Sequence, residues 1–414
     1  MRLQMSKLTF LEKLDLSFTP LSSLKFVNNR RFSMLYLNIS FTFLNTVHWY
    51  DKDISIDVID LRNTKLNYDL KTSKLLQKVS AGAAVYGDSY KLCCDKFKGP
   101  GIRTHSCKAP KDAISSCENL LGHVVKHILI WMVAMVGLTG NAVVIGYRLF
   151  YEKHLLKQGY RMFVTHLGLS DFIMSVYLMI IAGADVYYRD DYVLYEDSSL
   201  CKAAGFLATL SAETSTLFVL MITIDRYLIF KDSLNQTKMT PKILTAVVSL
   251  IWAIGTVIST IPVVFPDWQI YSSNAMCLGL PVNVTHPLGW MFSLLLYIGI
   301  NFIIIVLIVL GQIVIFKHIT MPRSSLVSSS VLKRREITVA NNLSFVVISK
   351  ILCWFPIGVI GLMSASGHVF SPDVYGWLAV VVLPLNSAVN PILYILPAAY
   401  KAFNNLGKTR PEMS

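Results

Sequence analysis

The hydrophobic positions of this chain follow two different patterns. In residues 1–90 apolar side chains recur at short fixed intervals, whereas residues 123–396 hold long and mostly apolar runs. Seven of these runs reach the roughly 18 residues that read as a membrane-spanning helix. They lie at about 124–149, 161–183, 202–227, 243–264, 288–316, 337–363 and 373–396. The pattern predicts an all-α bundle of seven transmembrane helices over 123–396, followed by a short tail at 397–414.

The first 90 residues repeat the spacing L-x-x-L-x-L-x₄-L. The three copies begin at Leu11, Met34 and Ile56, which are 23 and then 22 residues apart. Their apolar positions are Leu11, Leu14, Leu16, Leu21, Met34, Leu37, Ile39, Leu44, Ile56, Ile59, Leu61 and Leu66. This is the leucine-rich-repeat period, in which short strands stack side by side. We expect an α/β solenoid fragment of an ectodomain. Because neither a polar cap nor a signal-peptide core precedes the first repeat, we expect the ectodomain to continue upstream.

Composition and charge place the chain in a membrane. Hydrophobic residues make up 54% of the sequence and charged residues 15%, with a mean hydropathy of +0.52, whereas soluble domains carry about 25% charge. The basic residues gather in alternate loops, which sets the N-terminus outside and the tail inside. These residues are Arg148, Lys153, Lys157, Arg161, Lys231, Lys238, Lys242, Lys317, Arg323, Lys333, Arg334 and Arg335. The net charge of +13 is explained by this bias and does not indicate nucleic-acid binding.

Cysteines and glycosylation sequons agree with this topology. Six cysteines fall on the predicted outer side: Cys93, Cys94, Cys107, Cys117, Cys201 and Cys277. Six thiols in an oxidising compartment allow three disulfides. Cys201 opens the third run and Cys277 precedes the fifth, which makes them natural partners, while the pairing of the other four stays open. The sequons at Asn38 and Asn283 also lie outside and predict N-glycosylation, whereas the sequon at Asn235 lies inside and should stay bare.

Several polar side chains interrupt the apolar runs. Asn386 and Asn390 lie one helical turn apart in the seventh run, and Pro391 weakens the backbone ladder beside them. Amides and carboxylates are expensive in hydrocarbon, so spans that keep them are expected to use them. Asp171 in the second run should therefore face the bundle interior. We expect it to lie near Asn141, Ser215, Asn386 and Asn390.

Short motifs along the seven runs identify a family. They are Gly140-Asn141, 167–171 (LGLSD), Asp225-Arg226-Tyr227, Trp252, Cys353-Trp354-Phe355-Pro356 and Asn390-Pro391-Ile392-Leu393-Tyr394. In this order they resemble rhodopsin-like (class A) G-protein-coupled receptors. The repeats and the cysteine-rich segment 91–122 narrow the resemblance to the leucine-rich-repeat-containing hormone receptors. Residues 185–201 and 205–211 look most like the relaxin-receptor branch.

The resemblance implies a function and roles for particular residues. An extracellular peptide or protein hormone would act through the ectodomain and the cysteine-rich hinge at 91–122, and the plasma-membrane bundle would pass the signal to a heterotrimeric G protein. At rest Arg226 would pair with Glu336 and hold spans three and six together, and ligand would favour the state in which span six swings away. The G-protein-facing residues would be Asp225, Arg226, Tyr227 and Glu336. The activation switch would comprise Trp354, Pro356, Asn390, Pro391 and Tyr394.

Lys350 departs from the family pattern. In the family, the cluster of Asp171, Asn141, Ser215, Asn386 and Asn390 binds a sodium ion in the inactive state. Lys350 lies one turn from Trp354 in the sixth run, where the hormone receptors usually carry Asp. A buried ammonium needs an anion, so we expect Lys350 to replace sodium as the counter-charge of Asp171. The alternative is that its side chain extends to the cytoplasmic interface.

Other classes of protein fit the sequence less well. It contains no glycine-rich phosphate loop, no His/Cys cluster with metal-ligand spacing and no recognisable catalytic constellation, so we expect no enzyme, metal site or organic cofactor. A light receptor or pump needs a Schiff-base lysine in the seventh span, and 373–396 contains none. A non-signalling leucine-rich-repeat decoy or adhesion protein remains the alternative. The intact Asp225-Arg226-Tyr227 motif favours a receptor.

Overall fold

The computed structural model of the chain forms two compact units, Met1–Asn119 and Leu120–Ser414. It describes residues 2–6, 11–27, 32–49, 54–64, 79–87, 107–109, 120–121, 123–151, 159–188, 195–196, 198–231, 239–268, 270–271, 276–280, 289–320, 330–368, 370 and 372–392. Several predicted sites lie outside these residues or have undescribed side chains: Cys93, Cys94, Cys107, Cys117, Asn283, Glu336 and Tyr394. The boundary between the units falls inside the predicted hinge. Most of that hinge, and the whole predicted tail, lie outside the described residues.

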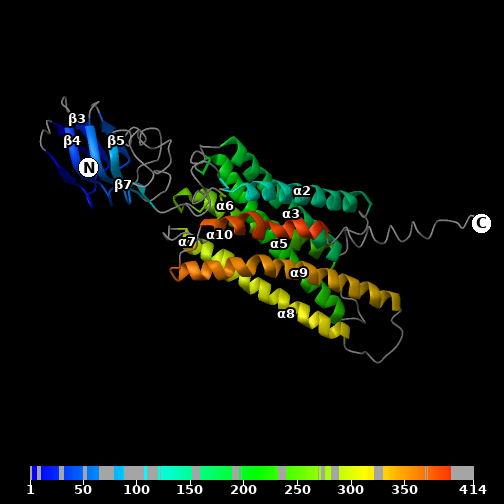
Figure 1. Cartoon of the computed structure of the whole chain (residues 1–414). Helices are drawn as coiled ribbons and strands as arrows, with labels where there is room; N and C mark the ends of the chain where they lie inside the picture. Colours follow the sequence, from blue (N-terminus) through cyan, green and yellow to red (C-terminus); the bar gives the residue numbers. More distant parts are fainter. Residues whose placement is uncertain are drawn as a thin grey trace, which may run out of the picture. The chain divides into compact units, whose positions relative to one another are not determined.

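In its described residues, the N-terminal unit forms two parallel β-sheets (Figure 1). The five-stranded sheet has the order β2 (Lys13–Asp15), β4 (Phe32–Asn38), β6 (Ile54–Asp60), β7 (Val79–Tyr86) and β8 (Cys107–Lys108). The three-stranded sheet has the order β1 (Arg2–Ser6), β3 (Ser23–Val27) and β5 (Thr46–Trp49). The register pairs equivalent positions of successive repeats, such as Leu14 with Leu37 and Leu37 with Ile59. The sequence repeat is therefore also the structural repeat.

The repeated apolar positions form the core of this unit. Met34, Leu37, Ile39 and Leu44 are completely buried, and their equivalents in the neighbouring repeats pack against them. The expected α/β solenoid, however, is not what the described residues show. The first two coils return through the strands β3 and β5, where helices were expected. In the described residues of these coils, which repeat every 22 or 23 residues, the second strand takes up positions that a helix would need.

A polar ladder closes each coil at the end of its strand. Asp15, Asn38 and Asp60 stand at equivalent positions, and each accepts the backbone N–H of the residue two places on, at 2.9, 3.0 and 3.1 Å. These are Asx turns, which fix the direction in which the chain leaves the strand. Asn38 also donates to Asp15 Oδ2 at 3.1 Å. The hydrogen bonds from Ser17 hold the pKa of Asp15 below its ordinary value.

The second unit is a bundle of long apolar helices, and all seven predicted runs are helical where they are described. The first four helices are α2 (Val124–Tyr151), α3 (Gly159–Tyr187), α5 (Ser199–Lys231) and α6 (Pro241–Val264). The fifth run comprises α7 (Trp290–Leu294), η5 (Leu295–Ile300) and α8 (Asn301–Thr320), and the sixth is α9 (Ser330–Ala365). The seventh comprises α10 (Pro372–Trp377), η6 (Leu378–Val382) and a helix over 383–392. Within the described part of the chain, six helices are long and apolar enough to cross a membrane, and Leu378–Ile392 is a shorter apolar helix. The chain is therefore a multi-pass membrane protein.

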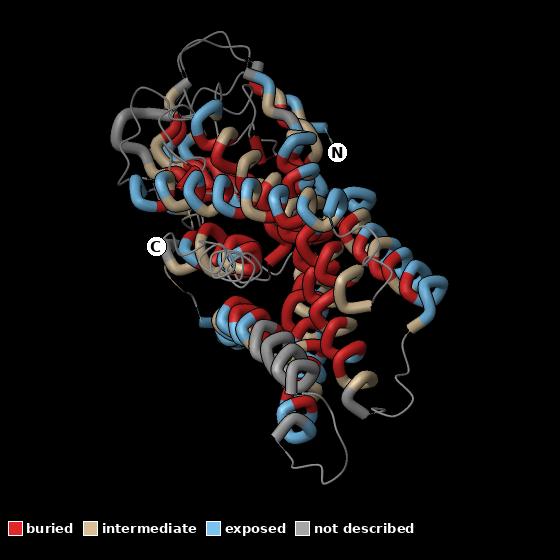
Figure 2. Tube along the Cα trace, turned by 90° about the vertical axis from the view of Figure 1, so that its right-hand side faces the viewer, coloured by how far each residue is buried: buried red, intermediate tan, exposed pale blue. Residues whose placement is uncertain are grey.

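Burial differs strongly among the helices. In the most apolar window of α5, 72% of the residues are buried, against 28% for α2 and for α6. The buried positions gather on the inner sides of the helices and the exposed ones on the outer sides (Figure 2). The exposed side chains are large and apolar, including Trp131, Leu250, Phe302 and Phe355, as expected for helices that face lipid tails. α5 is thus the central helix, and its polar residues point into the protein.

Two spans contain π-helical turns, which lie at Leu295–Ile300 and Leu378–Val382. Such turns insert one extra residue into the helical ladder, so that the following side chains rotate, and they occur frequently at functional sites. In the fifth span the Asn301 side chain donates to the carbonyl of Leu296 at 3.1 Å. The π turn places Tyr297 inside the bundle, where it is 4% exposed.

Candidate functional site

Asp171 is the centre of a buried polar core. It lies in the middle of α3 and is completely shielded from solvent. Ser215 on α5 donates to its Oδ1 at 3.3 Å, and Ser387 donates to the same oxygen at 3.0 Å. Asn390 donates to Oδ2 at 2.6 Å. A buried carboxylate is tolerated only when donors satisfy its oxygens, and here the donors come from two other spans.

Lys350 on α9 enters this core from the sixth span. Its side chain is 4% exposed, and its Nζ donates to Ser215 Oγ at 2.7 Å. Because the same hydroxyl donates to Asp171, Ser215 relays between the ammonium and the carboxylate. The structure therefore places the Lys350 ammonium inside the bundle, one hydroxyl group away from Asp171, and does not direct it to the cytoplasmic interface. That it serves as the counter-charge of Asp171 stays a prediction.

Asn141 and Asn386 border the core without bonding to the Asp171 carboxylate. Asn141 Nδ2 donates to the carbonyls of Ser387 at 3.0 Å and Gly137 at 2.8 Å. Asn386 Oδ1 accepts from Ser349 Oγ at 2.9 Å. The predicted cluster of Asn141, Asp171, Ser215, Lys350, Asn386 and Asn390 is brought together. Two further serines, which were not predicted, take part: Ser387 bonds to both Asn141 and Asp171, and Ser349 bonds to Asn386.

A second buried carboxylate escaped the sequence analysis. Glu213 on α5 is 2% exposed, and its Oε1 accepts from Asn301 Nδ2 on α8 at 3.0 Å. It also interacts electrostatically with Lys350. The signal was present in the sequence, because a glutamate in the middle of the third apolar run is as unusual as Asp171 in the second.

Trp354 lies one helical turn after Lys350 on α9 and is 5% exposed. It stacks on Tyr297 with ring centroids 6.2 Å apart. The Tyr297 hydroxyl is hydrogen-bonded to Thr209 Oγ1 at 2.8 Å. A small cavity has both Trp354 and residues of the polar core in its wall. It is lined by Met174, Ser211, Ala212, Ser215, Lys350, Cys353, Trp354, Leu383, Asn386 and Ser387.

The proline positions are consistent with joints in the helices. Pro356 lies inside α9, two residues after Trp354, where it removes a backbone hydrogen bond and favours a kink. Pro391 packs tightly on the first span. A Cβ atom added to Gly140 would lie 2.7 Å from Pro391 Cβ. Glycine at 140 thus permits the close approach of α2 and the seventh span beside Asn390.

The Asp225-Arg226-Tyr227 motif lies at the opposite end of α5 from Cys201. Arg226 Nη2 donates to Asp225 Oδ2 at 2.9 Å, and both side chains are largely buried. The Arg226 guanidinium also lies over the ring of Tyr160 on α3, 4.7 Å from its centroid, a favourable cation–π arrangement. The side chain of Glu336 lies outside the described residues, so the Arg226–Glu336 pair stays a prediction.

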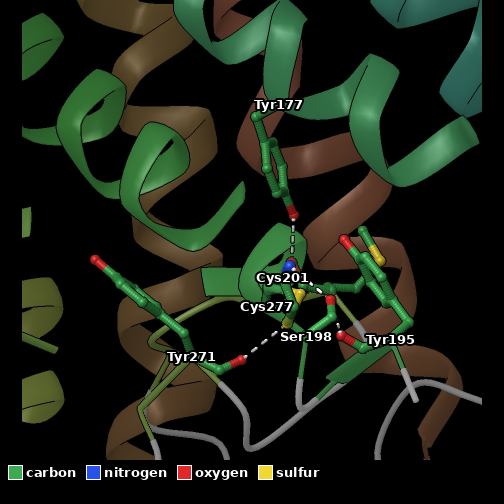
Figure 3. The surroundings of a disulfide bond; sticks show 7 residues. Tyr177, Tyr195, Ser198, Cys201, Tyr271 and Cys277 are labelled. Carbon is green, nitrogen blue, oxygen red and sulfur yellow. Dashed lines mark hydrogen bonds between the residues drawn. A yellow bond between two sulfur atoms is a disulfide. The ribbon is translucent and has the colours of Figure 1, made fainter. Parts of the chain in front are cut away.

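Near the start of α5, at the end of the bundle away from Asp225-Arg226-Tyr227, Cys201 and Cys277 form the predicted disulfide (Figure 3). Tyr177 on α3 donates to the carbonyl of Met276 at 2.9 Å, and Ser198 donates to the carbonyl of Tyr195 at 2.6 Å. Nearby, burial raises the pKa of the Tyr271 hydroxyl, which lies 3.0 Å from Thr209 Oγ1 and 3.0 Å from the carbonyl oxygen of Ser259. The loop over 276–280 is thereby fixed to α3 and α5.

The polar core does not fit a sodium ion. Sodium is held by oxygen atoms. Those of this core are on Asp171 and Ser215, together with the buried Asn141 Oδ1 and Asn390 Oδ1, which accept no hydrogen bond from the described residues. The Ser215 oxygen already accepts from the Lys350 ammonium, and both Asp171 oxygens accept hydrogen bonds. A positive charge thus stands beside the carboxylate already. Among the described residues, no group of three or more His, Cys, Asp or Glu side chains could hold a metal ion.

The fold and the buried polar core define a helical membrane protein of the seven-span class. Comparison with known families identifies the family, because residues 140–394 match the model of the 7 transmembrane receptor (rhodopsin family). This match covers more than half of the chain, and the protein belongs to that family. It is accordingly a receptor by family rather than a member of an enzyme class.

Similar proteins include hormone receptors. The chain is 33% identical to the G-protein coupled receptor GRL101 of Lymnaea stagnalis over 75% of its length, which covers 28% of that relative. It is 30% identical to relaxin receptor 2 of Homo sapiens over 75% of its length, covering 41% of the relative. The follicle-stimulating hormone receptor of Felis catus is 26% identical over 70% of the chain, again with 41% coverage. The chain thus spans less than half the length of each of these relatives.

Proposed function

We propose that this protein is a G-protein-coupled receptor that transmits the binding of an extracellular peptide or protein hormone, of the relaxin type, to a heterotrimeric G protein. The observation that carries the proposal is the polar core. Asp171 on α3, Ser215 on α5, Lys350 on α9 and Asn390 in the seventh span are joined by consecutive hydrogen bonds. Four helices that share buried polar contacts can exchange one packing arrangement for another.

The predicted orientation places the ectodomain outside the plasma membrane and the Asp225-Arg226-Tyr227 motif inside. Two features support this orientation. Basic residues gather in the loops on the side of that motif, and the disulfide Cys201–Cys277 lies at the other end of α5, where an oxidising compartment is required. Arg226 would then stand where a cytoplasmic G protein can reach it.

The N-terminal unit is proposed to be part of a leucine-rich-repeat ectodomain that takes part in hormone binding, with residues 91–122 as its hinge. Three observations support this. The strands are parallel, they pair at the sequence repeat, and the repeated leucine positions fill the core. The relaxin and follicle-stimulating hormone receptors to which the chain is similar are hormone receptors by name.

The mechanism is a shift between two populations of the bundle. In the resting state Lys350 on α9 is hydrogen-bonded to Ser215 on α5, and Trp354 packs on Tyr297. A hormone that prefers the open state would move the cytoplasmic half of α9 away from Arg226, with Pro356 as the joint. The opened side would bind the G protein.

Nucleotide exchange in native-like membranes tests this proposal. Membranes containing surface-verified wild type and Arg226→Ala would be mixed with a panel of G proteins, with and without added relaxin. We expect exchange from the wild type and its loss in Arg226→Ala, with relaxin binding unchanged. Relaxin binding without exchange from the wild type on any G protein would favour the decoy or adhesion alternative. Exchange without relaxin binding would keep the receptor class and reject the hormone.

A further inference from the structure

Three charged side chains lie together in the interior of the bundle: Asp171, Glu213 and Lys350. They belong to three different helices, α3, α5 and α9, and are exposed by 0%, 2% and 4%. Ions with so little contact with water must be compensated by one another. Besides Asp171, the acid predicted for Lys350, a second buried acid, Glu213, interacts electrostatically with the lysine.

Lys350 is linked to one acid through a hydroxyl group and interacts electrostatically with the other. Its Nζ bonds to Ser215, whose hydroxyl passes the interaction to Asp171. Glu213 precedes Ser215 by two residues on α5 and interacts electrostatically with Lys350 as well. An ammonium has three N–H donors, so one lysine can serve both sides. Each acid has its own fixed donor besides, Asn390 for Asp171 and Asn301 for Glu213.

This arrangement disfavours an inorganic cation beside Asp171. The Ser215 oxygen next to the carboxylate already accepts from the ammonium at 2.7 Å. A sodium ion there would meet the positive charge of Lys350 at the wall of the small cavity that Ser215 and Lys350 share. Two like charges at such short range in a medium of low polarity repel strongly.

We propose that Lys350 is the built-in cation of this core, shared between Asp171, through Ser215, and Glu213, and that the bundle is consequently insensitive to sodium. The lysine stabilises the resting packing of α3, α5 and α9 at every salt composition. This inference concerns the stability of the bundle itself and does not depend on the proposed hormone or G protein.

Thermal unfolding of the purified full-length chain in detergent tests the proposal. The unfolding temperature would be measured in NaCl and in KCl at equal ionic strength. Wild type should unfold at the same temperature in both salts. Lys350→Asn vacates the cation position, so its unfolding temperature should be higher in NaCl and rise with the logarithm of sodium concentration. A sodium-specific rise in wild type, or none in Lys350→Asn, would overturn the proposal.

Two sets of variants keep the test decisive. Asp171→Asn combined with Lys350→Asn should lose the sodium effect, since the carboxylate that binds sodium is gone. If Lys350→Asn does not fold, Asp171→Asn, Glu213→Gln and their combination replace it. Each single variant leaves Lys350 one counter-charge, whereas the double variant leaves a buried unpaired ammonium. The double variant should therefore lower the unfolding temperature by more than the sum of the singles. Strict additivity would contradict the shared-lysine arrangement.

Discussion

Lys350 and Asp171 face each other across one hydroxyl group. The Ser215 Oγ accepts from Lys350 Nζ at 2.7 Å and donates to Asp171 Oδ1 at 3.3 Å. This relay ties the sixth span to the second through the central helix α5. Any outward movement of α9 must break it or find Lys350 another partner. Glu213, which lies on the same helix as Ser215, is proposed to share Lys350 with Asp171 in the resting packing, so the same movement would disturb that interaction as well.

Asn390 should contribute strongly to the stability of the bundle. It donates to Asp171 Oδ2 at 2.6 Å, and both side chains are completely buried. Asn390→Ala would leave a buried carboxylate oxygen without its donor, which costs about 1–3 kcal/mol or more for a charged group. The measurement is chemical or thermal unfolding of the purified chain.

Thr139→Ala is the matched control for Asn390→Ala. Thr139 is exposed on α2 and donates only within its own helix, to the carbonyl of Met135 at 2.7 Å. Its loss should change stability by less than about 0.5 kcal/mol. Equal destabilisation by both variants would mean that the Asp171–Asn390 hydrogen bond contributes no more to the free energy of unfolding than an exposed hydrogen bond within one helix.

Gly255 should be required for the packing of α6 on α5. A Cβ atom at this position would lie 2.5 Å from Thr214 Cγ2 and 3.1 Å from Leu210 Cδ1. Thr214 cannot easily yield, because its hydroxyl is hydrogen-bonded to Ser170 and to the carbonyl of Leu210. We expect Gly255→Ala to destabilise the protein by about 1–3 kcal/mol through overpacking.

The control for Gly255→Ala is Gly146→Ala in α2, where an added Cβ meets nothing within 4 Å. Alanine there should be neutral or stabilise the helix by about 0.5–1 kcal/mol. Unfolding temperatures of the two variants, measured side by side, check the pair. Equal unfolding temperatures for Gly255→Ala and Gly146→Ala would contradict tight packing of α6 on α5 at Gly255.

The disulfide Cys201–Cys277 should be needed for a stable bundle. It holds the loop over 276–280 against α5, and loss of a native disulfide costs about 2–5 kcal/mol in small domains. Cys201→Ala, Cys277→Ala and the double variant should lower surface expression and unfolding temperature equally, since each removes the same bond. A double variant much worse than either single would show that the two cysteines act separately.

The helices were predictable because apolar length alone defines a membrane span. That Asp171 and Lys350 lie inside the bundle could be expected, because a charged side chain facing lipid is costly. The partners were less predictable, because they depend on how each helix is rotated. Ser387 and Asn301 bond to Asp171 and Glu213 only in the packed bundle, and the π turns at Leu295–Ile300 and Leu378–Val382 alter that rotation with no marked residue in the sequence.

The N-terminal unit shows the same division between pattern and packing. The repeat of Leu14, Leu37 and Ile59 predicted which residues form the core, and all three lie there. It could not predict what returns the chain between the strands. Strands of the second sheet occupy the place where helices were expected, because the leucine spacing defines only one side of each coil.

Glycosylation provides a test of membrane orientation. When the chain is expressed in mammalian cells, Asn38→Gln and Asn283→Gln should each remove one glycan, because both sequons lie on the predicted outer side. Asn235→Gln is the control and should leave the mass unchanged, since its sequon lies on the cytoplasmic side. Gel mobility before and after treatment with an N-glycosidase reads the result. A glycan at Asn235 would reverse the orientation.

The bundle is proposed to be a signalling switch that a contact between spans three and six holds at rest. Basal nucleotide exchange tests this on a panel of G proteins, in membranes that hold equal surface amounts of wild type and Glu336→Ala. Removing the carboxylate predicted to hold Arg226 should raise the basal rate on at least one G protein. No exchange from either form, with surface expression verified, would contradict the account.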